Sequence, residues 1–233
     1  MPAFGRIPPS DRIHESRYAL AAVLPETVAT VEHALPLPYA YRDNYDQGSE
    51  GACVGFSCSW AMSILNRRFY DAQWLYEEAQ RTDEWPGEAY DGTSVRAGLD
   101  VLRLEGHRRI YHGRSLPVDP VAGISEFRWT ETVDGVRTAI AAGAPVVLGI
   151  DWLEGFMQPV QRGRDWWIDD ASGRVAGGHA ICCYGASDRR QAVKLVNSWG
   201  LGYPLVWCSY AMLERLLTGF TYPGEAAVLT DRL

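Results

Sequence analysis

The segment 51–68 limits the possible folds of this chain most, because a helix built from it is apolar on two sides. One apolar row recurs every three to four residues and contains Val54, Cys58, Ala61, Leu65 and Phe69. A second row lies beside it and contains Phe56, Trp60 and Ile64. Since a helix with more than one apolar side is stable only when other elements cover it, the segment predicts a buried central helix.

The two halves of the chain differ in the secondary structure that their patterns predict. Helices are expected over 72–81, 93–105 and 132–142, with Thr93 as the cap of the second and Gly143 after the last. Short apolar runs predict strands at 146–151, 178–184, 192–197 and 205–209. Helices followed by strands predict an α+β protein with two lobes, the helical one over about 45–125 and the strand-rich one over about 126–220.

Residues 1–40 precede this pattern and are interrupted by the prolines Pro8, Pro9, Pro25, Pro36 and Pro38. A brief helix over 26–35, capped by Thr27, is the main regular element expected there. We therefore expect residues 1–40 to form an arm that packs on the folded domain, which covers 41–233.

Composition and charge exclude several kinds of partner. The chain has 233 residues, 47% of them hydrophobic and 22% charged, as is usual for a globular protein with a substantial core. Its formal net charge of -7 argues against nucleic acid or an anionic membrane as a partner, because both attract basic surfaces. The longest weakly polar run, 139–150, is too short to span a bilayer. We expect neither a nucleic-acid nor a membrane partner.

Four side chains along the chain form a coherent chemical set. Cys53 stands at the start of the apolar helix and Gln47 lies six residues before it, while His179 and Asn197 come much later. Attack by a thiolate on an acyl group needs a nucleophile, a proton shuttle, a group that orients the shuttle and a donor for the oxyanion. The set predicts a cysteine hydrolase.

Each of these residues has a physical reason for its place. A helix N-terminus and a nearby imidazolium both lower the pKa of a thiol, which favours a Cys53 thiolate paired with His179. Asn197 would orient the imidazole, and the side-chain amide of Gln47 with the backbone N–H of Cys53 would hold the oxyanion. A zinc site of His179 with Cys182 and Cys183 is disfavoured, because neighbouring strand residues point to opposite faces. We expect no metal and no cofactor.

The residues Gln47, Cys53, Gly178-His179-Ala180 and Asn197-Ser198-Trp199-Gly200 together resemble the papain-like cysteine peptidases, and their spacing agrees with that family. A weaker match is Asp91-Gly92-Thr93-Ser94, so that the resemblance extends over roughly 45–215. It implies a helical N-terminal lobe, a β-barrel-like C-terminal lobe, an active-site cleft between them and a peptide or protein substrate. It also implies the substrate-binding residues Gly92, Thr93, Gly178 and Trp199.

The chain departs from the family at several positions. Glu50 stands where secreted members carry a cysteine that forms a disulfide, and the chain has five cysteines, an odd number. Since disulfides are rare in reducing compartments, we expect a disulfide-free cytoplasmic protein of bacterial or phage type. The arm 1–40 is too short and too broken for the long helical pro-segment of many members, so a pro-segment-free form is expected.

Two other functions use the same residues. An amidase, a deamidase or a transglutaminase-type acyl transferase would keep the Cys-His-Asn chemistry and change the acyl group or its acceptor. A binding module without activity would keep only the fold. The complete set of Gln47, Cys53, His179 and Asn197 argues against the binding module, because loss of activity would allow at least one of them to change.

Overall fold

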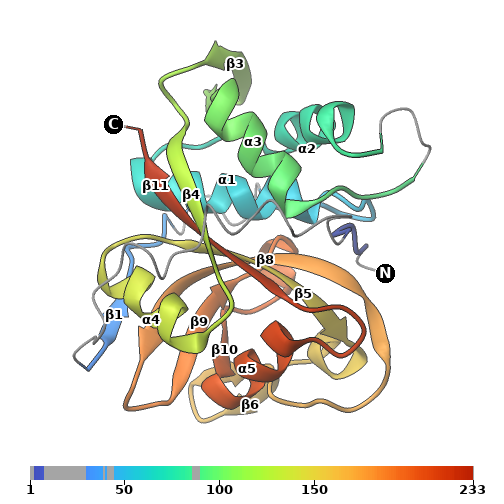
Figure 1. Cartoon of the computed structure of the whole chain (residues 1–233), viewed down its shortest axis with the longest axis vertical. Coiled ribbons are helices and arrows are strands. Elements are labelled where there is room, and N and C mark those ends of the chain that lie inside the picture. The colour runs from blue at the N-terminus through green and yellow to red at the C-terminus, as the bar shows by residue number, and fades with distance from the viewer. Residues whose placement is uncertain (1–2, 8–29, 39, 41–44, 86–89, 233) are drawn as a thin grey trace.

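The computed structural model describes residues 3–7, 30–38, 40, 45–85 and 90–232. Residues 8–29 of the expected arm, and with them most of the helix predicted over 26–35, lie outside the described residues. Helices gather in one part of the molecule and most strands in the other (Figure 1). The predicted α+β fold is thus confirmed.

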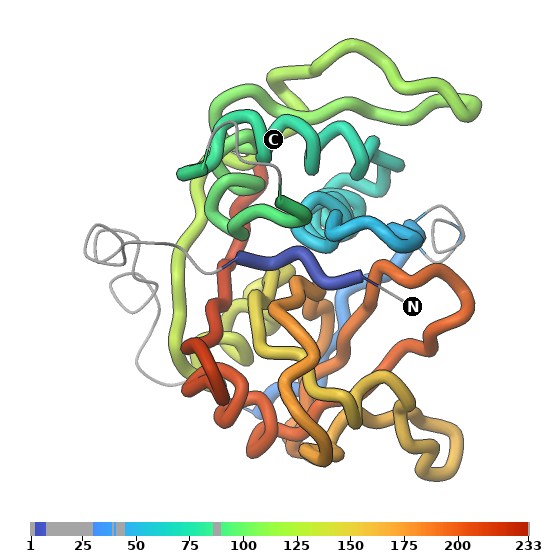
Figure 2. The backbone as a smooth tube through the Cα atoms, turned by 90° about the vertical axis from the view of Figure 1, so that its right-hand side faces the viewer, coloured from blue at the N-terminus to red at the C-terminus, as the bar shows by residue number. Residues whose placement is uncertain are grey.

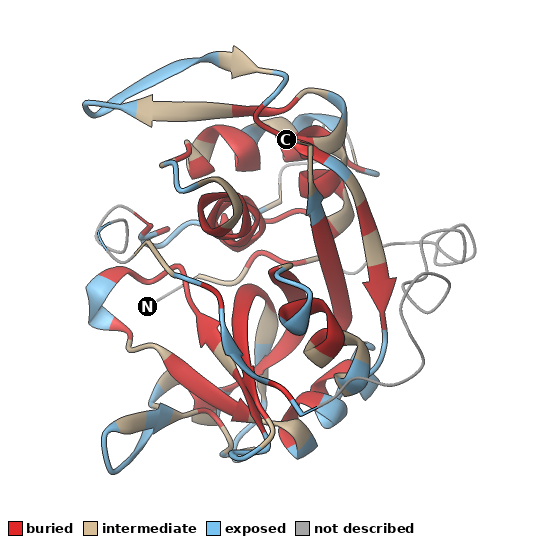
Figure 3. Ribbon diagram, turned by 90° about the vertical axis from the view of Figure 1, so that its left-hand side faces the viewer, coloured by how far each residue is buried: buried red, intermediate tan, exposed pale blue. Residues whose placement is uncertain are grey.

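Helix α1 (Cys53–Asn66) is the centre of the helical part. All residues from Cys53 to Ile64 are buried, and the helix is enclosed on every side in Figure 3. It ends at Arg67, which has a left-handed backbone (φ 54°) and donates its N–H to Ser63 O at 3.0 Å. The central buried helix predicted from its two apolar rows is confirmed.

Helices α2 (Ala72–Thr82) and α3 (Val95–Leu104) cover α1. The predicted cap of α3 at Thr93 is wrong: Ser94 is the cap, and its Oγ accepts the N–H of Ala97 at 3.1 Å. The hydroxyl of Thr93 instead donates to Asp83 Oδ2 at 2.8 Å. The backbone of Thr93 is therefore left outside the helix, where it can pair with another segment.

The strands form a nine-stranded sheet and a separate hairpin. The sheet has the order β4-β11-β5-β8-β9-β10-β7-β6, with β1 paired to β8. Its strands are β1 (Glu32–Ala34), β4 (Ile124–Thr130), β5 (Val146–Leu153), β6 (Val160–Arg162), β7 (Asp165–Trp167), β8 (Val175–Ser187), β9 (Ala192–Val196), β10 (Val206–Ser209) and β11 (Glu225–Asp231). The hairpin consists of β2 (His107–Tyr111) and β3 (Arg114–Asp119).

The sequence predicted β5, β8, β9 and β10 but missed the other strands. Helix α4 (Val133–Ala141) begins at its predicted cap, where Thr132 Oγ1 accepts the N–H of Gly135 at 3.0 Å. Helix α5 (Tyr210–Thr218) was not predicted, and neither were the two short 3₁₀ turns Glu154–Met157 and Gly200–Gly202. Residues 32–34 form strand β1 instead of the end of a helix, because pairing with β8 outweighs their local preference.

The segment Ala3–Ile7, called here the N-terminal segment, runs between the helical and the strand-rich parts (Figure 2). Its backbone pairs with both of them. Arg6 N–H donates to Gly178 O on β8 at 3.1 Å, whereas Thr93 N–H donates to Gly5 O at 2.7 Å and Ile7 N–H to Thr93 O at 2.9 Å. The N-terminal segment is thus built into the fold as an extended connection between the two parts.

None of the helices in the described part of the chain is long and apolar enough to cross a membrane. The five cysteines all lie within that part, and each is buried with a free thiol.

Candidate active site

Cys53 is the first residue of α1 and lies where the helix meets the sheet. Its Sγ accepts the backbone N–H of Ala180, on β8, at 3.3 Å. The turn before the helix is fixed by Asp91, whose Oδ1 accepts the N–H of Gly51 at 2.7 Å. The thiol is therefore held at a helix N-terminus and against the residue that follows His179.

His179 and Asn197 form the second part of the site. His179 Nε2 lies 2.7 Å from Asn197 Oδ1, and the same oxygen accepts the N–H of Ser198 at 2.8 Å. Because that oxygen accepts both bonds, Nε2 of the imidazole must carry the proton and donate it. The other ring nitrogen, Nδ1, is buried and has no hydrogen-bond partner in the described structure. Nδ1 is thus the ring nitrogen that carries no proton and is able to accept one.

Aromatic rings enclose the imidazole of His179. Trp152 lies edge-on at 4.7 Å between ring centroids, and the ring of Trp199 is tilted at 5.0 Å. Phe4 of the N-terminal segment covers a further edge at 5.9 Å. These rings keep water away from the bond between His179 and Asn197, which strengthens that bond. Trp199 was predicted here, whereas Trp152 and Phe4 were not.

The side-chain amide of Gln47 is held by hydrogen bonds at both of its ends. Its Oε1 accepts the hydroxyl of Ser198, and its Nε2 donates to Glu50 O at 2.8 Å. The second amide hydrogen points to Ala3 O, which lies 3.2 Å from Nε2. The amide is thus already oriented to donate to a carbonyl oxygen in the groove, as an oxyanion donor must be.

The four residues predicted to bind substrate all border the N-terminal segment. Thr93 and Gly178 pair with its backbone as described above, and the ring of Trp199 lies 6.2 Å from that of Phe4. A Cβ on Gly92 would clash with the carbonyl of Gly5. We call the surface formed by these four residues with Gln47 and Cys53 the groove. The groove therefore holds an extended peptide, which belongs to the chain itself.

The N-terminal segment lies close against the thiol. The backbone of Gly5 acts on the Cys53 thiol by lowering its pKa, and a Cβ on Gly5 would clash with the carbonyl of Gly51. Only glycine fits between these two groups. Gly5 is thus the residue of the segment that covers the nucleophile.

This cover changes the protonation of the site. Burial raises the pKa of Cys53 to about 11, against the opposing effect of backbone hydrogen bonds from Ala180 and Gly5. Burial also lowers the pKa of His179 to about 4, and the hydrogen bond to Asn197 opposes this shift. Near neutral pH the covered site therefore holds a neutral thiol and a neutral imidazole. The ion pair expected from the sequence requires that the cover opens and solvent enters.

The structure adds Arg6 and Glu225 to the surroundings of the site. The side chain of Arg6 is wholly buried, and its Nη2 lies 3.3 Å from Glu225 Oε1. Neither residue belongs to a recognisable motif, and 218 positions of chain separate them, so no local pattern could have linked them.

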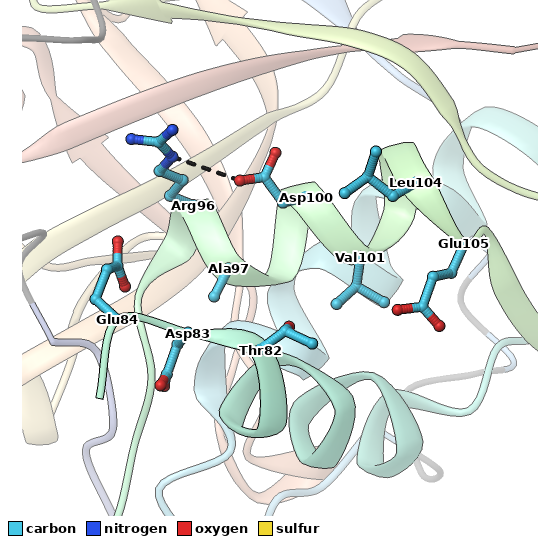
Figure 4. Close-up of a pocket in the computed structure, with 9 residues that line it drawn as sticks. All are labelled: Thr82, Asp83, Glu84, Arg96, Ala97, Asp100, Val101, Leu104 and Glu105. Atoms are coloured by element: carbon cyan, nitrogen blue, oxygen red, sulfur yellow. Dashed lines mark hydrogen bonds and ion pairs between the residues drawn. The ribbon is translucent and has the colours of Figure 1, made fainter. Parts of the chain in front are cut away.

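A second cavity, of about 370 Å³, lies between the end of α2 and α3 (Figure 4). It is bordered by several charged side chains, among them Arg96, which pairs with Asp100 at 3.4 Å. None of Gln47, Cys53, His179 and Asn197 lines it. It is therefore separate from the site described above.

Comparison with known proteins shows which known structures the fold resembles. No protein-family model matches the chain. Xylellain, a cysteine protease from Xylella fastidiosa, has a similar structure, with a TM-score of 0.68 at 19% identity over 99% of this chain and 96% of that one. Procathepsin B S9 from Trypanosoma congolense gives a TM-score of 0.60 at 12% identity, covering 98% and 86% of the two chains.

A further similar structure is digestive procathepsin L 3 of Tenebrio molitor larval midgut, with a TM-score of 0.58 at 15% identity over 98% of this chain and 75% of that one. In sequence, the chain is similar to an uncharacterised peptidase C1-like protein of Acanthamoeba polyphaga mimivirus. The two are 24% identical over 218 residues, which cover 79% of this chain and 70% of the relative. The chain has the fold of papain-like cysteine proteases, as its sequence predicted.

Proposed function

We propose that this protein is a cysteine peptidase with Cys53 as nucleophile, His179 as proton shuttle, Asn197 as the residue that orients it, and Gln47 as oxyanion donor. One observation carries the proposal most: the groove, which includes Gln47 and Cys53, already binds an extended peptide backbone. Gln47 donates to a carbonyl of that backbone, and the Cys53 thiol contacts the neighbouring residues.

The reaction can begin once the N-terminal segment has moved away from the thiol and a substrate has taken its place. Nδ1 of His179 takes the thiol proton, and the Cys53 sulfur forms a bond to the carbonyl carbon of the substrate. The negative charge moves to the carbonyl oxygen, where Gln47 Nε2 and the backbone N–H of Cys53 stabilise it. When the carbon–nitrogen bond breaks, His179 gives its proton to the leaving amine. Water then hydrolyses the thioester and regenerates the thiol.

The backbone contacts of the groove favour a polypeptide substrate over a small amide. The backbone N–H and C=O of Thr93 and the C=O of Gly178 pair with an extended segment as a neighbouring strand would, and these bonds involve only main-chain atoms. A deamidase or transglutaminase would need to accept a side-chain amide at Cys53 instead. We infer that the acyl group comes from a peptide bond, with side-chain amide chemistry as the second candidate.

The proposal is tested with the full chain carrying Arg6→Ala, which weakens the hold of the N-terminal segment. A peptide library should be cleaved by this variant and left intact when Cys53→Ala is added. Cys58→Ala is the matched control, because Cys58 is equally buried on the same helix but lies outside the groove. Cleavage that survives Cys53→Ala, or release of ammonia from glutamine side chains without cleavage, would overturn the peptidase assignment.

A further inference from the structure

One face of α2 carries a row of three polar side chains that all bind the segment 90–93. Tyr76 and Gln80 are four residues apart on the helix, and Asp83 follows three residues later as its C-cap residue (Figure 4). At this spacing the three side chains lie on the same side of a helix. We call Tyr76, Gln80 and Asp83 the polar row. Tyr76 and Asp83 are buried, so the row faces the interior and not the solvent.

Each member of the polar row binds the segment 90–93 at a different point. The hydroxyl of Tyr76 accepts the N–H of Gly92 at 3.1 Å. Gln80 Nε2 donates to the carbonyl oxygens of Tyr90 at 3.2 Å and Gly92 at 3.1 Å. Asp83 Oδ2 accepts two hydroxyl groups of the segment, one of them that of Tyr90 at 2.6 Å. The segment is thus attached to α2 through main-chain donors and acceptors as well as through side chains.

Asp91 connects the same segment to the turn that precedes Cys53. Its Oδ1 accepts the N–H of Gly51 at 2.7 Å and the hydroxyl of Tyr76 at 3.3 Å. The turn and the segment touch at this point, because a Cβ on Gly51 would lie only 2.6 Å from that oxygen. Since all five cysteines are free, the connection is made by hydrogen bonds and close packing instead of a disulfide.

Helix α2 is itself fixed against α1, close to Cys53 in the chain. A Cβ on Gly55 would lie 2.5 Å from Ala72 O and 2.7 Å from the Cβ of Tyr76. Gly55 is the third residue of α1, so the backbones of the two helices are in contact within two residues of Cys53. Three contacts therefore close a ring: α1 on α2, α2 on the segment 90–93, and that segment on the turn before Cys53. Such a ring fixes the position of the segment relative to Cys53.

The segment 90–93 forms one wall of the groove, and the turn adjoins it. Thr93 gives its N–H and its C=O to an extended backbone. Gln47, the proposed oxyanion donor, is held by the turn through Glu50 O, which accepts its Nε2 N–H at 2.8 Å. A peptide paired with Thr93 therefore meets Gln47 and Cys53 correctly only when the wall and the turn keep their spacing. A displacement of about 1 Å between reacting groups can lower a rate about 100-fold.

We propose that Tyr76, Gln80 and Asp91 are positioning residues, which set the place of a bound peptide relative to Cys53 by fixing the wall of the groove. The inference rests on the proposed peptidase function. The three residues act through the main chain of the wall and of the turn, so their effect depends on the substrate. An extended polypeptide, which pairs with Thr93, needs them, whereas a small acyl compound that reaches only the thiol does not.

The first test compares two substrates in the full chain carrying Arg6→Ala. One is an extended peptide selected from a library by that chain, and the other is p-nitrophenyl acetate, a small ester that reacts with a thiol without reaching Thr93. Tyr76→Phe removes only the hydroxyl, and it should lower kcat/KM for the peptide by about tenfold or more and leave that for the ester unchanged. Tyr111→Phe is the matched control, because Tyr111 is 65% exposed on β2. Equal loss on both substrates, or no loss on either, would overturn the proposal.

Two variants of Asp91 then test whether its hydrogen bond to the turn is what matters. Asp91→Ala should lower cleavage of the peptide as Tyr76→Phe does. Asp91→Asn keeps an oxygen that can accept the N–H of Gly51, so it should retain most of the cleavage. The same loss in both variants would contradict positioning through this bond.

A measurement without catalysis separates this inference from the peptidase function. In the chain with Cys53→Ala and Arg6→Ala, binding of a labelled peptide with the sequence of residues 3–7 is followed by fluorescence anisotropy. Tyr76→Phe should raise its Kd by about tenfold. A raised Kd supports the positioning role even if no peptide is cleaved, whereas cleavage with unchanged Kd and unchanged kcat/KM supports only the peptidase function. If Tyr76→Phe does not fold, Gln80→Ala at a half-buried position takes its place, with the same expected rise and the same contradicting result.

Discussion

Two histidines in the described part of the chain are fully buried, His107 and His179, and they differ in the hydrogen bonding of one ring nitrogen. His107 accepts the N–H of Arg108 at Nδ1 (2.9 Å), and its Nε2 lies 2.9 Å from Ser59 Oγ, whose own proton goes to Gly55 O. His179 is hydrogen-bonded through Nε2 only, and its buried Nδ1 has no hydrogen-bond partner in the described structure. Both rings lie among aromatic residues, and burial lowers the pKa of both, to about 3 for His107 and about 4 for His179.

The comparison shows what separates a structural histidine from a candidate catalytic one. Burial and a lowered pKa are common to both rings and indicate neither role. The difference is the lone pair of His179 Nδ1, which has no donor in the described structure. Leaving a buried polar atom unpaired costs stability, so such an atom calls for a functional explanation. In His107 both ring nitrogens are hydrogen-bonded to groups of the helical part.

The largest effect should come from replacing each of these two histidines in a separate variant. In the chain with Arg6→Ala, His179→Ala should lower kcat by at least about 1,000-fold, since the thiol then has no base. His107→Gln should keep kcat within a few-fold and instead lower the free energy of unfolding by about 1–3 kcal/mol. Steady-state kinetics and urea denaturation measure the two quantities. Comparable loss of kcat in both variants would break the distinction.

The second prediction concerns the cover over Cys53. In the unchanged chain, alkylation of Cys53 by iodoacetamide should rise only toward the thiol pKa of about 11. Arg6→Ala should move the rise to lower pH, because solvent then stabilises the thiolate and the imidazolium of His179. At pH 7 we expect labelling to be faster by roughly 100-fold, since each pKa unit changes the thiolate fraction tenfold.

Peptide mass spectrometry after labelling identifies the modified residue and its rate. Arg215→Ala is a matched control, because Arg215 is on the surface of α5 and stacks on Phe220 away from the groove. An unchanged pH profile in Arg6→Ala would show that the N-terminal segment does not control the thiol.

Gln47 should show a smaller and more selective effect. Gln47→Ala removes a donor that acts on charge developing in the transition state, so kcat should fall by about 100-fold with little change in KM. Asn197→Ala should also lower kcat, because the imidazole loses its orientation, and should leave substrate binding largely unchanged. A rise in KM alone for Gln47→Ala would make this residue a contact to the substrate ground state.

The smallest effect concerns stability in acid, where the two histidines should act alike. Each has a folded pKa below the unfolded value of about 6.5, so the unfolded state binds a proton that the folded state does not. Their neutral forms stabilise the fold fully above pH 6.5, and this stability is lost as the pH falls toward 4 for His179 and 3 for His107.

Between pH 6.5 and its folded pKa, each histidine should lower the free energy of unfolding by about 1.4 kcal/mol for every unit that the pH falls. Urea denaturation at pH 7, 6 and 5 measures the slope, and His107→Gln should reduce it by the share of one group. A slope that His107→Gln leaves unchanged would show that this ring is not titrating.

The central helix could be predicted because its signal is local, and the proposed site residues Cys53, His179, Asn197 and Gln47 likewise stand in short local motifs. A 3.6-residue apolar period and short motifs need no knowledge of distant segments. The cap at Ser94 was misread as Thr93 because both are hydroxyl residues and only the tertiary contact with Asp83 separates them.

Other features had weak or no local signals. Helix α5 does have a local signal: a serine cap is followed by two apolar pairs at helical spacing, Met212 with Leu213 and Leu216 with Leu217. The hairpin β2–β3 alternates poorly, and its exposed residues gave no strand pattern. The meeting of Arg6 with Glu225 depends on the ends of the chain coming together, which no window of sequence contains.

Gly5 fits closely at the thiol because it has no Cβ, and this distinguishes the N-terminal segment from a peptide that has a side chain at the same position. No residue with a side chain can take its place, because Cβ would collide with the carbonyl of Gly51. A residue with a side chain therefore cannot lie as close to Gly51 as Gly5 does. The fit of the N-terminal segment at this point thus depends on the absence of a side chain, and so on one glycine.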